Sequence, residues 1–302
     1  MASLKTLLIG REGQLAWELR RTLACLGEVV ALGRGSGGLD LADFDAVRAA
    51  AREIKPGLIV NAAAYTAVDQ AEREPELAFR INAEAVRVLA EEALAMGAGL
   101  VHYSTDYVFS GDGRSPYREH DPTGPLNVYG LSKLAGEEAI RATGVPHLIL
   151  RTAWVYGRRG QNFLLTMLRL LRERESLKVV DDQRGAPSWS RLIAEATALL
   201  ITRSTRNGRF EPAERAGTYH LSCGGETTWY GFAETIRELG QSLGILPEAC
   251  ARLEPIPSSG YPTPARRPGY SVLSNEKLSK EFELALPDWK EALRLCLDES
   301  GR

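Results

Sequence analysis

The sequence predicts an α/β fold: a Rossmann-type, doubly wound parallel sheet with helices on both faces, followed by a smaller C-terminal domain. Short apolar runs of strand length alternate with longer helical patterns through residues 1–155, and this alternation is typical of βαβ units. Within the helical segments, apolar residues recur every three or four positions, as at Leu15, Leu19 and Leu23. That spacing marks one buried face of a helix.

The first 155 residues give the elements of the sheet in order. We expect strands at 6–10, 28–32, 57–64, 99–109 and 146–151, and helices at 14–27, 43–56, 75–98 and 128–144. Asn127 is a suitable N-cap for the last of these helices, because its side-chain oxygen can accept a hydrogen bond from a first-turn N–H. Gly144 is expected to end the same helix.

Beyond residue 155 the alternation becomes less regular. We expect helices at 161–175 and 227–244, a strand at 217–222, and a loop at 255–269, which is rich in proline and glycine. The sequence therefore predicts two domains, residues 1–155 and residues 156–302. Some segments of the second are expected to return and pack on the sheet of the first.

Composition and charge limit the class of function. The 302 residues carry a formal net charge of −2, so they lack the basic excess that attracts nucleic acid or an anionic membrane. The sequence shows no signal-peptide pattern and no apolar run of the ~18 residues that a membrane span needs, which favours a cytoplasmic protein. The four cysteines and four histidines lack metal-ligand spacing. We therefore expect a small-molecule partner and no metal site.

A glycine-rich loop follows the first expected strand. Gly10, Gly13 and Ala16 form a G-x-x-G-x-x-A string at the first strand–helix junction. Glycine lets the backbone turn sharply and approach a pyrophosphate, and the helix N-terminus offers free N–H groups and partial positive charge. This position favours a dinucleotide site.

The end of the second expected strand indicates which dinucleotide binds. NAD-preferring sites usually carry an acidic residue about 20 positions after the fingerprint, to bind the ribose 2′-hydroxyl. Gly33 and Arg34 stand there instead, and an arginine can pair with a 2′-phosphate. The alternative is that Arg34 is a solvated loop residue. The sequence predicts that NADPH is preferred, with NADH as a second substrate.

A tyrosine and a lysine lie four positions apart in the expected helix 128–144. Tyr129 and Lys133 would share one face, one turn apart. A neighbouring ammonium lowers the pKa of a phenol, so the pair would be a general acid that protonates an alkoxide. Ser104 and Thr105, at the end of an expected strand, could polarise the same carbonyl group.

These motifs, in this order, resemble the extended short-chain dehydrogenase/reductases. Longer strings narrow the resemblance to the dTDP-4-dehydrorhamnose reductase family: NAAAYTAVDQAE, HYSTDYVFSG, PLNVYGLSKLAGE, RTAWVYG, NFLLTMLRL, VVDDQRGAPS and YPTPARRP. The resemblance runs nearly from end to end. It implies NADPH-dependent reduction of the 4-keto group of dTDP-6-deoxy-L-lyxo-4-hexulose to give dTDP-L-rhamnose, a cofactor domain over 1–155 and a mainly substrate-binding domain over 156–302.

The resemblance also implies roles for individual residues. Tyr129 would be the acid, Lys133 the group that tunes it, and Thr105 the hydrogen-bond partner of the carbonyl. The implied cofactor contacts are Gly10, Gly13, Gln14, Leu15, Arg34, Asp40, Leu41, Ala62, Ala63, Ala64, Tyr129 and Lys133. The implied substrate contacts are Ser104, Thr105, Asp106, Tyr129, Trp154, which would pack on the sugar, and Arg266, which would approach the diphosphate.

The sequence departs from the family pattern at three places that bear on function. Ala16 replaces the third glycine of the fingerprint, and Ala153 replaces a hydroxyl residue. Some members form dimers through a divalent ion held by glutamates. Glu18 and Glu299 fit that pattern, but Arg191 would repel a cation. We therefore predict that magnesium is dispensable and that the protein is a monomer or a homodimer.

Two other functions remain open from the sequence. One is a related nucleotide-sugar enzyme, a 4-epimerase or a 4,6-dehydratase. Dehydratases of this superfamily typically place a glutamate after the Thr-Asp pair, where this chain has Tyr107. The other is a non-catalytic NADP-binding regulatory subunit, against which the intact Thr105, Tyr129 and Lys133 argue.

Overall fold

The computed structural model describes residues 4–34 and 38–298. Its centre is a six-stranded, wholly parallel sheet with the strand order β12-β5-β4-β3-β1-β2. These strands span Thr6–Ile9 (β1), Val29–Leu32 (β2), Leu58–Asn61 (β3), Gly99–Thr105 (β4), His147–Thr152 (β5) and Gly217–His220 (β12). The predicted α/β fold class is confirmed.

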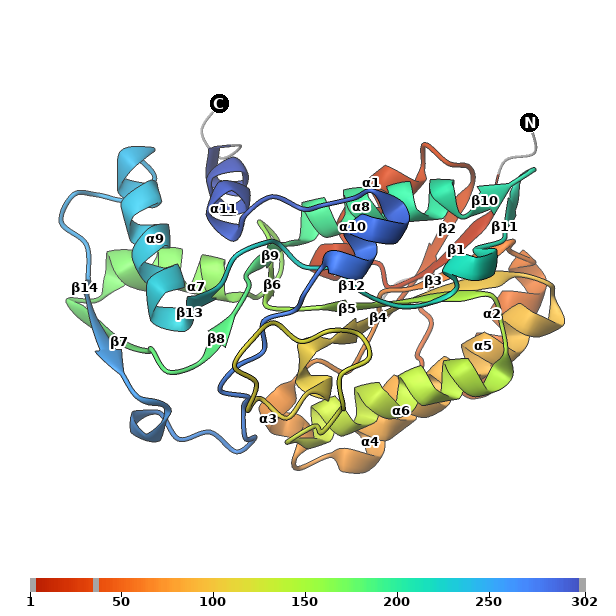
Figure 1. The fold of residues 1–302 in the computed structure, drawn as a ribbon, viewed down its shortest axis with the longest axis horizontal. Coiled ribbons are helices and arrows are strands. Elements are labelled where there is room, and N and C mark those ends of the chain that lie inside the picture. The colour runs from red at the N-terminus through yellow and green to blue at the C-terminus, as the bar shows by residue number, and fades with distance from the viewer. Residues whose placement is uncertain (1–3, 35–37, 299–302) are drawn as a thin grey trace.

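Helices cover both faces of this sheet (Figure 1). One face carries α2 (Phe44–Ile54), α5 (Ala85–Ala95) and α6 (Val128–Thr143), and the other carries α1 (Gln14–Leu23), α8 (Ser190–Arg203) and α10 (Glu276–Phe282). Each face has its own apolar core. Because parallel strands are buried on both sides, the central strands β1, β3 and β4 are buried at every position.

Three elements from the second half of the sequence belong to this layer. Helix α8 packs on α1, strand β12 pairs with β5, and α10 packs near β12. The chain therefore passes repeatedly between the sheet and a smaller lobe. The domain boundary at residue 155 stays a prediction.

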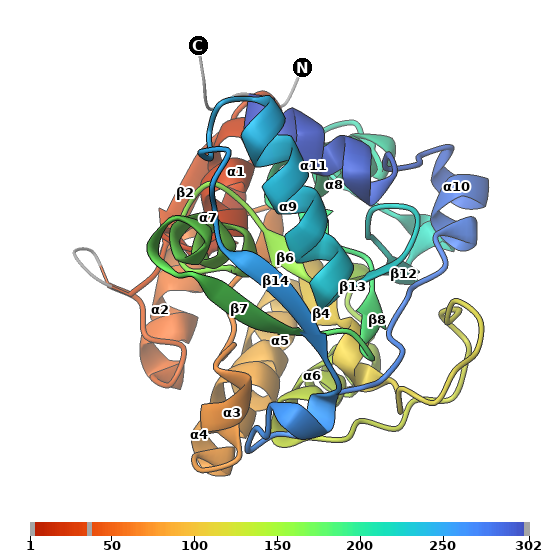
Figure 2. The same ribbon diagram turned by 90° about the vertical axis from the view of Figure 1, so that its left-hand side faces the viewer.

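The smaller lobe has its own core beside the sheet (Figures 1 and 2). Its helices are α7 (Phe163–Glu173), α9 (Trp229–Ser242) and α11 (Trp289–Asp298), with a parallel strand pair, β7 (Ser176–Val180) and β14 (Arg252–Ile256). The remaining short elements are α3 (Val68–Ala71), α4 (Pro75–Phe79), β6 (Val155–Tyr156), β8 (Arg184–Gly185), β9 (Ser188–Trp189), β10 (Thr205–Arg206), β11 (Arg209–Phe210), β13 (Thr227–Thr228), and 3₁₀ turns at Asp106–Val108, Ala213–Arg215 and Ser258–Gly260.

The single helix predicted at 75–98 is interrupted by a π-helical turn at Arg80–Glu84. Within this turn, the Asn82 side chain accepts from Tyr65 N at 2.8 Å and donates to Tyr65 O and to Ser132 Oγ on α6. The Asn82 carbonyl lies where a β-carbon on Gly136 would stand. A π turn widens the helix locally, and here it brings the backbone into contact with α6.

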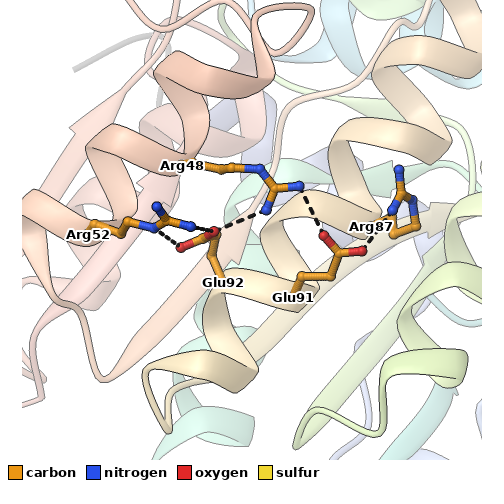
Figure 3. A network of polar contacts seen from close by, with 5 residues as sticks. All are labelled: Arg48, Arg52, Arg87, Glu91 and Glu92. Atoms are coloured by element: carbon orange, nitrogen blue, oxygen red, sulfur yellow. Dashed lines mark hydrogen bonds and ion pairs between the residues drawn. The ribbon is translucent and has the colours of Figure 1, made fainter.

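An ion-pair network joins α2 to α5 on the same face of the sheet (Figure 3). Arg52 donates two hydrogen bonds, of 2.8 and 2.7 Å, to Glu92, and Arg48 bridges Glu92 and Glu91. The hydrogen bonds from Arg52, followed by those from Arg48, hold the pKa of the buried Glu92 carboxyl below its ordinary value. This network fixes the packing of the two helices and lies away from the carboxyl ends of the strands.

Among the described residues, no helix is both long and apolar enough to cross a lipid bilayer.

Candidate active site

A cleft of about 790 Å³ opens at the carboxyl ends of β1, β3 and β4. The chain runs from β1 to β2 on one side and then to β3 on the other, and ligands bind at such a reversal of strand order. The lining includes these residues: Gly10, Arg11, Gly13, Gln14, Leu15, Gly33, Arg34, Leu39, Leu41, Ala62, Ala63, Ala64, Tyr103, Ser104, Tyr129, Lys133, Thr152, Val155 and Gln161.

The glycine-rich loop forms one end of this cleft. Gly10 has a φ of +108°, which favours glycine, and a β-carbon there would lie 3.2 Å from Cβ of Ala16. Gly13 is the N-cap of α1 and has no side chain to bind the first-turn N–H groups, which are left for an anion. The Gln14 amide turns the other way, donating to Val155 O at 3.0 Å and accepting from Asn162.

The next part of the cleft wall follows β2. A β-carbon on Gly33 would lie 2.9 Å from Arg11 N, so glycine allows the two loops to approach. Arg34 lines the cleft with its side chain 69% exposed and its Nη2 3.9 Å from Asp40 Oδ1. Leu41 lines the cleft beside it, whereas the Asp40 carboxylate is exposed and accepts from Ala42 N. Arg34 is therefore free to reorient toward a phosphate at small cost.

Tyr129 lies in the first turn of α6, on the opposite wall. The predicted N-cap is confirmed: Asn127 Oδ1 accepts from Gly130 N at 2.8 Å, while its Nδ2 donates to Arg266 O at 2.8 Å. One side chain thus starts the helix and ties it to the loop at 255–269. The Thr105 hydroxyl, at the end of β4, donates to Asp106 Oδ1 at 3.0 Å and accepts from Tyr107 N at 3.2 Å.

The expected lowering of the Tyr129 pKa by Lys133 is wrong in this structure. Burial, opposed by the nearby Thr105 hydroxyl and aided by the Asp106 charge, raises the pKa of Tyr129 to about 12. The reason is the direction of the lysine, whose Nζ donates to Tyr103 O at 2.6 Å and lies 3.1 Å from His102 Nε2. The amine therefore faces β4.

Of the predicted substrate contacts, Ser104 and Tyr129 line the cleft, whereas its lining does not include Thr105, Asp106, Trp154 or Arg266. Ser104 lines it, and Asp106 is buried beside Thr105, where burial raises its pKa to about 6. Trp154, with an unusual φ of +46°, stacks on Trp229 with ring centroids 3.5 Å apart and an interplanar angle of 2°. The Arg266 side chain is exposed.

Similar known proteins show the family to which this chain belongs. The protein-family model described as "RmlD substrate binding domain" matches residues 4–302. A curated Burkholderia thailandensis protein named dTDP-4-dehydrorhamnose reductase is 49% identical over 295 residues, covering 97% of this chain and 98% of that protein. This chain belongs to the dTDP-4-dehydrorhamnose reductase family. The resemblance inferred from the sequence motifs is confirmed.

Solved structures of dTDP-4-dehydrorhamnose reductases share the fold along the whole chain. The Clostridium acetobutylicum structure has a TM-score of 0.88 and 36% identity, covering 98% of this chain and 99% of that one. The Bacillus anthracis structure, solved in complex with NADP, has a TM-score of 0.87 and 33% identity, covering 99% and 100%.

Within this reductase fold, sequence reasoning missed residues that reach the cleft from distant segments. Thr152, Val155 and Gln161 line it from β5 and beyond, and Thr152 Oγ1 is buried with no hydrogen-bond partner among the described residues. Trp229 was missed as the partner of Trp154. Its only local signal is the aromatic pair in the string TTWYGF.

Glu18, considered above as a ligand of a shared divalent ion, forms an ion pair with Arg191 instead. Arg191 Nε lies 3.3 Å from Glu18 Oε2, and Glu299 lies outside the described residues. Across residues 4–34 and 38–298, no three His, Cys, Asp or Glu side chains gather as metal ligands would. That magnesium is dispensable stays a prediction.

Proposed function

We propose that this protein reduces the 4-keto group of dTDP-6-deoxy-L-lyxo-4-hexulose with NADPH, giving dTDP-L-rhamnose. The observation that carries the proposal is one cleft that joins a glycine-rich loop at a helix N-terminus to Tyr129 on the opposite wall. Full-length relatives are named as reductases of this nucleotide sugar. We further propose a cytoplasmic protein that is a monomer or a homodimer.

The residues of the cleft fit a dinucleotide. Gly10 and Gly13 leave the backbone accessible at the N-terminus of α1. Thr152, whose hydroxyl has no hydrogen-bond partner in the described part of the chain, lines the same cleft. Arg34 can supply a guanidinium for a 2′-phosphate. Gln14, Leu15, Leu41 and Ala62–Ala64 form walls around it. When bound, NADPH supplies the hydride for the carbonyl carbon.

Tyr129 supplies the proton. A phenol with a pKa of about 12 is protonated at neutral pH, so the proton is in place when the carbonyl oxygen becomes an alkoxide, which is a much stronger base than a phenolate. The Thr105 hydroxyl, whose proximity lowers the pKa of the phenol, can stabilise the developing charge. Lys133 lies one turn further along α6, at the same wall of the cleft. We propose that the substrate is contacted by Ser104, Asp106, Trp154 and Arg266.

The test is to follow NADPH absorbance with the keto-sugar nucleotide and to determine the C4 stereochemistry of the product by NMR. The proposal requires one NADPH oxidised per product and the rhamno configuration at C4. Conversion with no net NADPH consumption would instead indicate an epimerase or a dehydratase. Tight NADPH binding without turnover would indicate a regulatory subunit.

Replacing Arg34 with alanine is expected to lower kcat/KM for NADPH about tenfold or more and to leave kcat/KM for NADH nearly unchanged. Only NADPH carries a 2′-phosphate, so only NADPH loses a charged hydrogen bond with the guanidinium. Arg209→Ala, an exposed arginine on β11, is the matched control. Equal losses with both cofactors would place Arg34 outside the 2′-phosphate site.

Replacing Trp154 with alanine is expected to raise KM for the sugar nucleotide about tenfold, since a large apolar surface is lost, while the Kd of NADPH stays unchanged. Trp154→Phe, which keeps an aromatic ring against Trp229, should recover part of the loss. A change confined to NADPH affinity would mean that Trp154 does not contact the sugar.

A further inference from the structure

A row of buried polar side chains, Asn61, His102 and Lys133, crosses from the sheet to α6. Asn61, the last residue of β3, and His102, on β4, are paired in register, so their side chains lie next to each other. Lys133 reaches them from α6. Asn61, His102 and Lys133 are 1%, 0% and 2% exposed, so each polar atom must find a partner within the protein.

One backbone N–H determines which atoms donate and which accept in the hydrogen bonds of this row. The Ala63 backbone N–H donates to one side-chain atom of Asn61 at 3.2 Å, and that atom must be Oδ1 because an amide NH₂ cannot accept. Asn61 Nδ2 therefore faces His102 Nδ1, at 3.1 Å. Since Nδ2 donates, Nδ1 accepts, and a neutral imidazole then carries its hydrogen on Nε2.

The second ring nitrogen points at the lysine. His102 Nε2 lies 3.1 Å from Lys133 Nζ, which also donates to Tyr103 O at 2.6 Å. An ammonium has three N–H donors and no lone pair. It could not accept a hydrogen bond from the Nε2–H, and two donors would face each other. A neutral amine accepts from Nε2–H and donates to Tyr103 O, so neither contact sets two hydrogens against each other.

We propose that Asn61 and His102 are positioning residues that favour the neutral, hydrogen-bond-accepting form of the Lys133 amine over the ammonium in the free protein. The relevance of this inference to catalysis rests on the proposed function. The arrangement of Asn61, His102 and Lys133 does not depend on that function. Lys133 would then take up a proton more readily when its contact with His102 is broken.

The charges around Lys133 agree with this assignment. Burial lowers the pKa of Lys133 to about 8, and Glu137, on the same helix, acts in the opposite direction. Glu137 is itself paired with Arg151 and Arg141, so its pull on the lysine is offset. Burial is the main cause that lowers the pKa of His102 well below its ordinary value, and it keeps the ring neutral also when Lys133 carries no charge. The carbonyl of Tyr103, on β4, accepts from the amine.

The test reads the two nitrogen centres directly in the full-length protein without substrate. With only four histidines and seven lysines, ¹⁵N-labelled histidine and ¹³Cε-labelled lysine give few NMR signals, and His102→Gln assigns the ring signals of His102. We expect the Nε2–H tautomer at His102 and a Lys133 signal that titrates at or below pH ~8, against ~10.4 for an ordinary lysine. An Nδ1–H tautomer, or a Lys133 that titrates near its ordinary value, would overturn the proposal.

Asn61→Asp reverses the direction of the hydrogen bonds along the row, while the side chain at position 61 keeps nearly the same size and shape. A carboxylate only accepts, so His102 must donate from Nδ1, and its Nε2 becomes an acceptor for a lysine ammonium. The Lys133 titration is then expected to move up by about one pH unit or more, and the basic limb of the kcat/KM profile should move with it. A Lys133 titration unchanged in this variant would contradict the proposal.

Asn82→Asp is the matched control, because Asn82 is equally buried and contacts α6 through Ser132 rather than Lys133. It should destabilise the protein without changing the His102 tautomer. If Asn61→Asp fails to fold, the wild-type tautomer and lysine titration still decide the matter. A protein that shows the expected tautomer but reduces no keto sugar would refute the proposed function alone.

Discussion

Replacing Tyr129 with phenylalanine is expected to lower turnover about 10²–10⁴-fold, the usual contribution of a positioned general acid, and to leave the Kd of NADPH nearly unchanged. The change removes one hydroxyl and keeps the ring that contacts Tyr107 edge to face at a centroid distance of 5.7 Å. Stopped-flow or steady-state NADPH oxidation gives the turnover, and fluorescence titration gives the Kd.

Tyr107→Phe is the control for this experiment, because it removes a hydroxyl from the neighbouring ring. Its turnover should fall far less than that of Tyr129→Phe. If Tyr129→Phe loses only a few-fold, another group donates the proton, and the buried Asp106, whose pKa burial raises to about 6, becomes the next residue to replace.

The pattern of the sequence predicted the parts of the fold that depend on local periodicity. The alternation of strands and helices gave the parallel sheet, and Asn127 and Gly144 correctly marked the ends of α6. The π turn at Arg80–Glu84 could not be predicted in this way, because it depends on contacts of Asn82 with Tyr65 and Ser132, 17 and 50 positions away. Strand β12 joins the sheet for the same kind of long-range reason.

The candidate site shows the same division. Gly10 and Gly13 were predictable, since the loop, the strand and the helix are consecutive in sequence. The direction of the Lys133 amine was not, because helical spacing places Lys133 near Tyr129 but says nothing of His102 on β4. The ring partner of Trp154 lies 75 positions downstream, at Trp229, beyond the reach of any local motif.

Replacing Arg151 with methionine is expected to lower the free energy of unfolding by about 3–5 kcal/mol at neutral pH, the usual cost of removing one partner of a buried ion pair. Arg151 Nε and Nη2 donate to the two oxygens of Glu137 at 2.8 and 2.7 Å, and both side chains are at most 3% exposed. Glu137 lies one turn beyond Lys133 on α6, so this pair fixes the catalytic helix to β5.

The pH dependence identifies the mechanism of this loss. Burial tends to raise the pKa of Glu137, but the hydrogen bond and charge of Arg151 outweigh it and hold the pKa below its ordinary value. The carboxylate therefore stabilises the fold above its unfolded pKa of ~4.3, and this stabilisation is lost as the pH falls through the folded value. In Arg151→Met the carboxyl protonates more readily, so urea unfolding should show a smaller deficit near pH ~5 than at pH ~7.

Two further variants separate the unpaired charge from lost packing. The double variant Arg151→Met with Glu137→Met removes both charges and should recover most of the stability, because apolar side chains can replace a buried pair at little cost. Arg169→Met breaks an exposed pair with Glu173 on α7 and should change little. If the double variant is as unstable as Arg151→Met, the loss comes from the packing of the arginine over the Phe109 ring rather than from the buried carboxylate.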